Sequence, residues 1–189
     1  MAERTLDGIR VAVLATDGFE QVELDGPRAA LDSAGAKTTL IAPKSGTIYG
    51  MKHHDKTGTV RVDLQLDEAN PENFDAVLIP GGALSADSLR VEPKAQEFVR
   101  QMDTSGKPVA VICHGPWLLV SARLVKGRTM TSYHTIQDDL RNAGATWTDK
   151  EVIRDRNWVS SRQPSDIPAF TREMILLFGE RRARGRAAS

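Results

Sequence analysis

Cysteine is almost absent from the sequence, whose 189 residues include only Cys113. A single cysteine cannot form an internal disulfide, and it fits a reducing compartment in which the thiol stays free for chemistry or for packing. A net charge is absent too, because 25 basic and 25 acidic side chains cancel. We therefore expect neither nucleic acid nor a membrane as the main partner, and a small molecule or a peptide as the substrate.

Long apolar runs are also missing. No stretch reaches the roughly 18 apolar residues of a membrane span, and the start "MAERTLDGIRVAVLATDG" has charges and glycine where a secretory signal is apolar. We expect a cytoplasmic protein with a single domain over residues 1–189 and a frayed basic tail at 181–189. No glycine-rich phosphate motif occurs, and His53 and His54 lack further ligands at metal-binding spacing, so we predict no cofactor and no metal.

Four short apolar runs punctuate the first two thirds of the chain. They lack the alternation of a strand with one wet face, which is typical of strands buried on both sides. Helical patterns separate them, and this order predicts an α/β domain with a mostly parallel sheet and helices on both faces. The runs are "RVAVLA" (10–15), "KTTLIA" (37–42), "DAVLIP" (75–80) and "PVAVIC" (108–113).

Proline and glycine mark the helix ends. In 26–35, Pro27 suits a first turn and Gly35 a C-terminal cap, and the pattern repeats over 92–106. Further helices are predicted over 135–144 and 167–180, the latter with an apolar face. Two segments break the rhythm: 46–74 predicts a hairpin excursion, and 145–166 predicts small antiparallel edge strands.

The strand ends suggest where a site would lie. Ligands of parallel sheets bind outside the carboxyl ends of the strands, which selects the loops "TDGFEQVEL", "PGGALSADSLR" and "CHGPW". If the three preceding strands are neighbours, Glu20, the Gly81-Gly82 turn and the Cys113-His114 pair meet in one pocket.

Cys113 ends a strand, and "HGPWLLVSA" begins a helix at once. Such a turn, a nucleophile elbow, raises a nucleophile above the sheet and strains its backbone. The helix N-terminus favours thiolate, so we expect a Cys113 pKa below the free value of ~8.5. The alternative is a buried cysteine that fills a gap in the core.

The neighbours of Cys113 suggest further roles. His114 is a candidate base, acid or backbone oxyanion donor, or only a polar turn residue. We expect Glu20 to face Cys113 and share a proton with it, and Glu23 to be a solvated helix carboxylate. The N–H of Gly82 is the second candidate for the oxyanion hole.

Several of these stretches together resemble a known family. The motifs "FEQVEL", "DAVLIPGG", "KPVAVICHGPWLLVSARLVKGRTMTSY", "DDLRNAGA" and "NWVSSRQPSDIPAF" resemble the PfpI family of the ThiJ/PfpI superfamily, relatives of class I glutamine amidotransferase domains, over residues 9–178. The resemblance implies a flavodoxin-like fold, a nucleophilic cysteine and a stress-associated activity as intracellular peptidase, glyoxalase or deglycase. It also implies at least a homodimer, with the site near the subunit interface.

The resemblance carries roles to particular residues. It makes Cys113 the nucleophile, His114 its following histidine, and Glu20 the glutamate that hydrogen-bonds the cysteine. Gly82 and the His114 backbone become the oxyanion hole. Asp87 corresponds to a carboxylate that reaches the histidine from a neighbouring subunit, although the loop "PGGALSAD" is one residue longer than the family pattern.

One further position departs from the family pattern. His134 stands where family members often have proline, and we expect it at the surface.

Three functions compete at this point. The first is a cysteine-dependent hydrolase in which Cys113 attacks a carbonyl of a peptide or of a small aldehyde-derived adduct. The second is a redox-sensing or holdase stress protein in which Cys113 is oxidised with little or no turnover. The third is a binding domain in which the cysteine is only structural.

Overall fold

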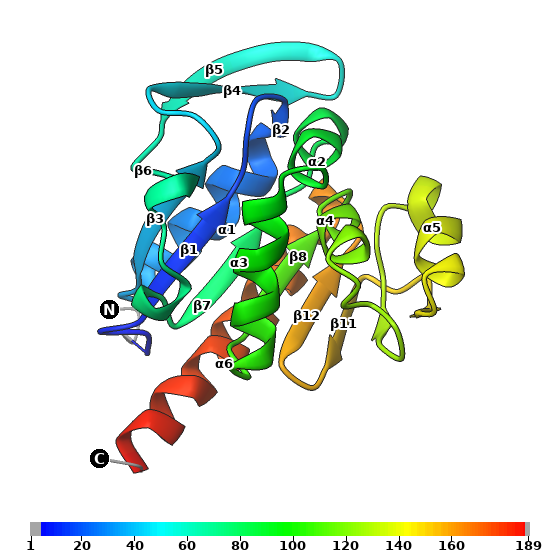
Figure 1. The fold of residues 1–189 in the computed structure, drawn as a ribbon. Helices are drawn as coiled ribbons and strands as arrows, with labels where there is room; N and C mark the ends of the chain where they lie inside the picture. Colours follow the sequence, from blue (N-terminus) through cyan, green and yellow to red (C-terminus); the bar gives the residue numbers. More distant parts are fainter. Residues whose placement is uncertain (1–4, 188–189) are drawn as a thin grey trace.

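The computed structural model describes residues 5–187, and the side chains up to residue 180. A seven-stranded sheet in the order β11-β12-β8-β7-β1-β3-β6 forms its centre (Figure 1). Every neighbouring pair is parallel except β11 with β12. This confirms the predicted α/β architecture. The strands of this sheet are β1 (Arg10–Leu14), β3 (Lys37–Ala42), β6 (Leu64–Gln65), β7 (Ala76–Ile79), β8 (Val109–Ile112), β11 (Val152–Asp155) and β12 (Trp158–Ser161).

Helices cover both faces of the sheet. On one face α1 (Gln21–Ser33) packs against α6 (Ile167–Ala187), and on the other α3 (Pro93–Thr104) lies beside α4 (Pro116–Ser121). Along β1, Val11 and Val13 belong to the first apolar core, whereas Ala12 and Leu14 belong to the second. The strand is apolar throughout because both of its faces are buried.

The helix boundaries differ in part from the prediction. Helix α1 begins at Gln21, so Pro27 lies inside the helix and not in its first turn. Gly35, with a φ of 94°, follows the C-terminus of α1 as expected, since glycine adopts positive φ without a Cβ clash. Helix α3 matches its predicted range. Two further helices are α2 (Ala83–Leu89) and α5 (Gln137–Asn142).

The hairpin excursion is present. Strands β4 (Thr47–Lys52) and β5 (Asp55–Arg61) pair in antiparallel fashion, and β4 also pairs with the short β2 (Phe19–Glu20) in a three-stranded sheet. Figure 1 shows this hairpin above β2, at one end of the molecule. The hairpin turn therefore lies near the end of the loop that follows β1.

The predicted antiparallel edge strands are correct only for β11. Strand β12 lies inside the sheet, parallel to β8, and β10 (Thr146–Trp147) pairs in parallel with β9 (Thr129–Met130). Two serines lie in this interior strand, and both are buried and hydrogen-bonded: Ser160 Oγ accepts from Thr131 N at 3.0 Å, and Ser161 Oγ donates to Glu151 O at 2.6 Å. Satisfied hydroxyls are tolerated in a core.

Helix α6 continues to Ala187, so the backbone of 181–187 is helical where a frayed tail was predicted. The side chains of that segment and residues 188–189 lie outside the described part. Among the described residues, no helix has the length and apolar character needed to cross a membrane. Four 3-10 helices complete the fold: η1 (Leu66–Glu68), η2 (Pro71–Asn73), η3 (His134–Ile136) and η4 (Pro164–Asp166).

Candidate active site

The three loops selected from the sequence meet because β1, β7 and β8 are adjacent. A cavity of about 550 Å³ opens there, and it contains the predicted Glu20, Gly82, Cys113 and His114. Its other lining residues are Glu23, His53, His54, Ala83, Tyr133, Thr135, Gln163, Pro164 and Ser165.

Cys113 has the strained backbone expected of an elbow. Its φ is 61°, one of few positive values among the described residues other than glycine. The strain is held from both sides, because Cys113 N donates to Ser161 O at 3.1 Å and Tyr133 N donates to Cys113 O at 2.9 Å. Gly115 allows the tight turn, since a Cβ there would lie 2.9 Å from Ile79 O.

The carboxyl group beside Cys113 is that of Glu23, so the predicted assignment to Glu20 is wrong. Glu23 has no exposed surface, and a Cβ on Gly81 would collide with its carboxyl group and with Cys113. Because α1 starts at Gln21, Glu23 lies on the buried face of its first turn together with Leu24. Glu20 precedes the helix, 9% exposed at the cavity wall, where its Oε2 accepts from His53 N at 3.2 Å.

Burial raises the pKa of Glu23 from its ordinary 4.5 to about 8, and the charge of Glu20 adds to this effect. Contacts with Cys113 and with the Gly81 backbone act in the opposite direction. Neither carboxyl oxygen of Glu23 has a hydrogen bond of good geometry to any residue that the structure describes. Burial is therefore the largest effect on the pKa of Glu23. At neutral pH Glu23 therefore carries a proton beside the sulfur.

The predicted acidity of Cys113 is also wrong in direction. The residue is 7% exposed, and burial followed by the charge of Glu23 raises the pKa of its thiol well above the ordinary value. The backbone N–H groups of Gly82 and His114 donate to the sulfur and lower the pKa, but by less. The helix behind the elbow, α4, is only 6 residues long, so its dipole is weak.

His114 contacts the sulfur and a hydroxyl group. Its Nδ1 lies 3.2 Å from Cys113 Sγ, and its Nε2 lies 3.4 Å from Thr135 Oγ1. Burial and, to a smaller extent, the charge of His134 lower the pKa of His114. The ring is thus a neutral imidazole at pH 7, which leaves one nitrogen able to accept a proton.

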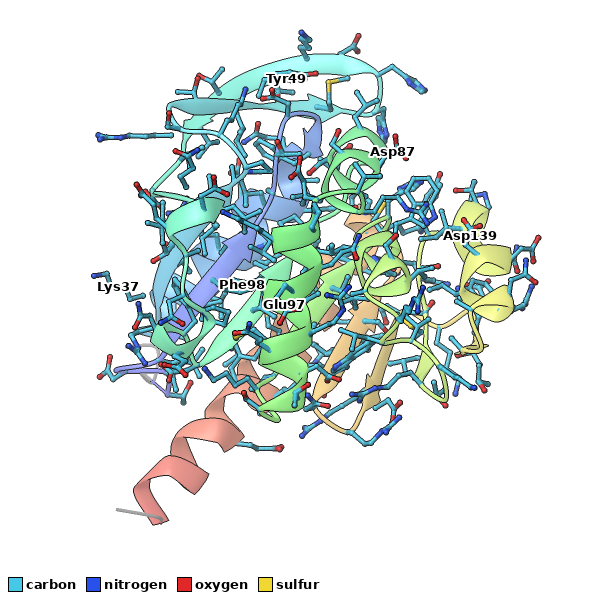
Figure 2. All side chains as sticks on the ribbon, viewed as in Figure 1. Lys37, Tyr49, Asp87, Glu97, Phe98 and Asp139 are labelled. Atoms are coloured by element: carbon cyan, nitrogen blue, oxygen red, sulfur yellow. The ribbon has the colours of Figure 1, made fainter. Side chains whose placement is uncertain are left out.

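Asp87 lies apart from this group. It is exposed on α2 and does not line the cavity (Figure 2). Its predicted contact with His114 across a subunit interface involves a second chain and stays a prediction. His134 is exposed, as expected, and packs on Tyr133 with ring centroids 4.5 Å apart. Among the described residues, no group of three or more side chains is arranged to hold a metal ion.

Comparison with known sequences assigns the chain to a protein family. The sequence profile of the DJ-1/PfpI family matches residues 9–177. The chain belongs to the DJ-1/PfpI family. Deglycase PfpI of Pyrococcus furiosus is 44% identical over 169 residues, which cover 89% of this chain and 99% of that protein. General stress protein 18 of Bacillus subtilis is 42% identical over 171 residues, covering 90% of this chain and 98% of that protein.

A solved structure agrees with this membership. A two-domain protein of Anabaena variabilis, with DJ-1/ThiJ/PfpI-like and ferritin-like domains, is 32% identical and superposes with a TM-score of 0.85. The match covers 90% of this chain and 48% of that protein. The fold is therefore the flavodoxin-like fold of the DJ-1/PfpI family, and the relatives identify an enzyme of the PfpI type.

Sequence reasoning missed several residues of this DJ-1/PfpI site. Glu23 had a signal, because it falls on the same helical face as the buried Leu24, Pro27 and Leu31. Burial of a carboxyl group on the apolar face of a helix costs free energy, so such a residue is a candidate for a functional role. Tyr133 and Thr135 had none, since they follow the two-residue strand β9, which is too short to recognise.

Proposed function

We propose that the chain is a stress-associated cysteine-dependent enzyme of the deglycase or glyoxalase kind, in which Cys113 attacks the carbonyl carbon of aldehyde-derived groups. The observation that carries the proposal is the surroundings of the sulfur. His114 Nδ1 lies 3.2 Å away, two backbone N–H groups face the sulfur, and the protonated Glu23 lies beside it. The name of the Pyrococcus relative supports the same chemistry.

The geometry supplies each part of an addition step. As the S–C bond forms, the thiol proton passes to His114 Nδ1 and the carbonyl π electrons move to oxygen. The N–H groups of Gly82 and His114 stabilise the developing oxyanion, and Glu23 has a proton to give it. For a dicarbonyl, hydrogen transfer between the two carbonyl carbons and hydrolysis of the resulting thioester yield a hydroxy acid and consume only water.

The cavity supports a substrate larger than a free dicarbonyl. A three-carbon dicarbonyl fills roughly 150 Å³ at about 30 Å³ per heavy atom, whereas the cavity measures about 550 Å³. The remaining space suits the side chain that carries an adduct. Gln163 and Ser165, which also line the cavity, offer polar contacts to it.

The structure favours an enzyme over a redox sensor. Sensor cysteines are accessible and of low pKa, but Cys113 is a buried residue, 7% exposed, and the pKa of its thiol is raised. A purely structural cysteine is also disfavoured, because a structural role needs neither the positive φ of Cys113 nor a position in the cavity wall.

The test compares wild type with Cys113→Ser on methylglyoxal and on a methylglyoxal-treated peptide, followed by product formation. We expect turnover of at least one of them, and a loss of about 10³-fold or more in the variant. Wild-type protein alkylated by iodoacetamide is the matched control, since Cys113 is the only cysteine of the chain. Equal turnover in the variant, or none in wild type, would overturn the proposal.

A further inference from the structure

His114 has a hydroxyl group where a catalytic histidine commonly has a carboxylate. Its Nδ1 contacts Cys113 Sγ at 3.2 Å, and its Nε2 contacts Thr135 Oγ1 at 3.4 Å. Among the described side chains no carboxylate is hydrogen-bonded to this ring. Cys113, His114 and Thr135 thus form a connected row of groups within one chain.

We propose that Thr135 is a positioning residue that holds His114 in the tautomer with its hydrogen on Nε2, so that Nδ1 is free to accept the proton of Cys113. This inference rests on the proposed function of Cys113. It adds that the row is completed by this chain itself and that its chemistry suits reactive carbonyls and not peptide bonds.

The surroundings of the sulfur determine which nitrogen is free. The backbone N–H groups of Gly82 and His114 face Sγ and favour its charged form, and the protonated Glu23 lies beside it. The proton of the thiol therefore needs an acceptor, and Nδ1 is the nitrogen lone pair within reach. A neutral imidazole carries a single N–H, so the hydrogen lies on Nε2 and donates to Thr135 Oγ1.

Aromatic side chains fix the plane of the ring but leave the tautomer open. Tyr133 lies with its centroid 4.9 Å from that of His114, and Trp117 meets the ring edge at 5.4 Å. Trp117 is itself held, because its Nε1 donates to Asp139 Oδ2 at 2.7 Å and Arg90 lies over its ring. These contacts do not depend on which nitrogen carries the hydrogen, so the tautomer is set by the two polar contacts of the ring together, Nδ1 with Cys113 Sγ and Nε2 with Thr135 Oγ1.

A hydroxyl partner has a chemical consequence that a carboxylate partner lacks. It contributes no negative charge to stabilise an imidazolium, and burial together with the charge of His134 lowers the pKa of His114 further. Cys113 and Tyr133 contact the ring, and Arg90 and Asp139 contact Trp117 beside it. The other titratable groups that line the same cavity are Glu20, Glu23, His53 and His54.

This difference assigns a substrate class. Amide cleavage requires an imidazolium that protonates the departing amine, and this site makes that ion costly. Addition to an aldehyde has no departing amine to protonate: His114 holds the thiol proton only while the S–C bond forms, and Glu23 has the proton for the new alkoxide. The site therefore suits carbonyl addition, with peptide hydrolysis disfavoured.

The direct test reads the tautomer. Full-length protein with ¹⁵N-labelled histidine is examined by long-range ¹H–¹⁵N NMR at pH 7.5, and the signals of His114 are assigned by their absence in His114→Gln. We expect the Nε2–H tautomer in wild type and in Thr135→Ser, and a shift toward Nδ1–H in Thr135→Val. Because Thr135 is exposed, valine leaves the fold intact, as circular dichroism will verify.

Asp87→Asn is the rival arm of the same experiment. If a carboxylate from a second chain held His114, this variant would change the tautomer or the His114 pKa, and Thr135→Val would not. That result would overturn the inference, and so would an Nδ1–H tautomer in wild type. The NMR result decides the inference even if no substrate is turned over, which separates its failure from failure of the proposed function.

Kinetics provide the second readout. With an aldehyde substrate, Thr135→Val lowers kcat by about 10- to 100-fold, the usual effect of losing a group that orients a reactive side chain, and leaves KM close to wild type. Thr135→Ser restores kcat because it keeps the hydroxyl. A change in KM alone, or no rescue by serine, would contradict a positioning role.

Discussion

The proton that Glu23 holds next to Cys113 is the most pH-sensitive feature of the site. Two buried acids in contact cannot both ionise at low cost, since each negative charge raises the pKa of the other. The pair therefore titrates as a unit, with Glu23 neutral below a pKa of about 8. The reactivity of the sulfur depends on which of the two groups is charged.

A first prediction concerns thiol labelling above that pKa. At pH 9 the ionised Glu23 of wild type disfavours the thiolate, and Glu23→Gln removes this charge, which lowers the pKa of Cys113. We expect iodoacetamide labelling at pH 9 to be about tenfold faster or more in the variant, equivalent to one pKa unit. Intact-mass measurements from pH 6 to 9.5, values chosen around the pKa of about 8, follow the single cysteine.

The matched control is Glu20→Gln. Glu20 lies in the same cavity but does not contact the sulfur, so labelling of this variant at pH 9 should stay near wild type. Acceleration in Glu20→Gln and not in Glu23→Gln would return the role to Glu20, as the sequence had suggested.

At this scale the sequence predicted which residues meet in one cavity and misassigned the carboxyl group beside the sulfur. Cys113, His114 and Gly82 were found because strand-end position and glycine chemistry are written in local sequence. The choice between Glu20 and Glu23 depended on the start of α1, because one residue of shift turns a helical side chain by about 100°. Pro27 suggested a later start, and the tertiary contacts of α1 overrode that signal.

At the scale of elements, the elbow depends on close packing between two strand ends. Gly81 lies in the loop between β7 and α2, and its missing side chain leaves room for the carboxyl group of Glu23 and for Cys113, whose Cβ would lie 2.5 Å from an added methyl. Glycine at this position therefore allows Glu23 of α1 to pack closely against Cys113 at the elbow.

A second prediction follows for Gly81→Ala. The new methyl displaces Glu23 or Cys113, and we expect a loss of roughly 1–3 kcal/mol in the free energy of unfolding, as for overpacking in cores. Turnover should fall as well. Gly58→Ala in β5 is the matched control, since nothing lies within 4 Å of its added Cβ. Urea unfolding of both variants provides the measurement, and equal stability would contradict the packing argument.

The strands were predictable where a run of apolar or β-branched residues marks them in the sequence. β1, β3, β7 and β8 were located because all are apolar runs. β12 was predicted at an edge although all four of its residues, two of them serines, are buried. β9 and β10 have two residues each, which is too short for a periodic pattern of apolar residues. The positions of such strands depend on pairing with residues distant in the sequence, and a local sequence pattern carries no information about these residues.

At the scale of the whole molecule, Glu23 links the site to global stability. Its pKa is about 8 in the folded protein against 4.5 for an ordinary carboxyl group. Between these values the unfolded chain has released a proton that the folded chain keeps. The contribution of Glu23 is thus fully present below pH 4.5 and is lost as the pH rises toward 8.

A third prediction is that Glu23→Gln flattens the dependence of stability on pH. The shift corresponds to up to about 5 kcal/mol, so the variant should gain stability relative to wild type as the pH increases to 8. Denaturant unfolding between pH 4.5 and 9 measures the two curves. Glu97→Gln, on the exposed surface of α3 (Figure 2), should keep the wild-type slope. Parallel curves for Glu23→Gln and wild type would refute the argument.

The hairpin of β4 and β5 has a consequence for how this molecule can diversify. Its turn carries His53 and His54 to the cavity. The hairpin is held by its pairing with β2, by hydrogen bonds to residues near the start of α1, and by Ile48, which is buried in the first apolar core. Among the described residues its strands pair with no strand of the seven-stranded sheet. Substitutions in the turn can therefore change the contacts offered to a substrate while the strands that form the elbow keep their pairing.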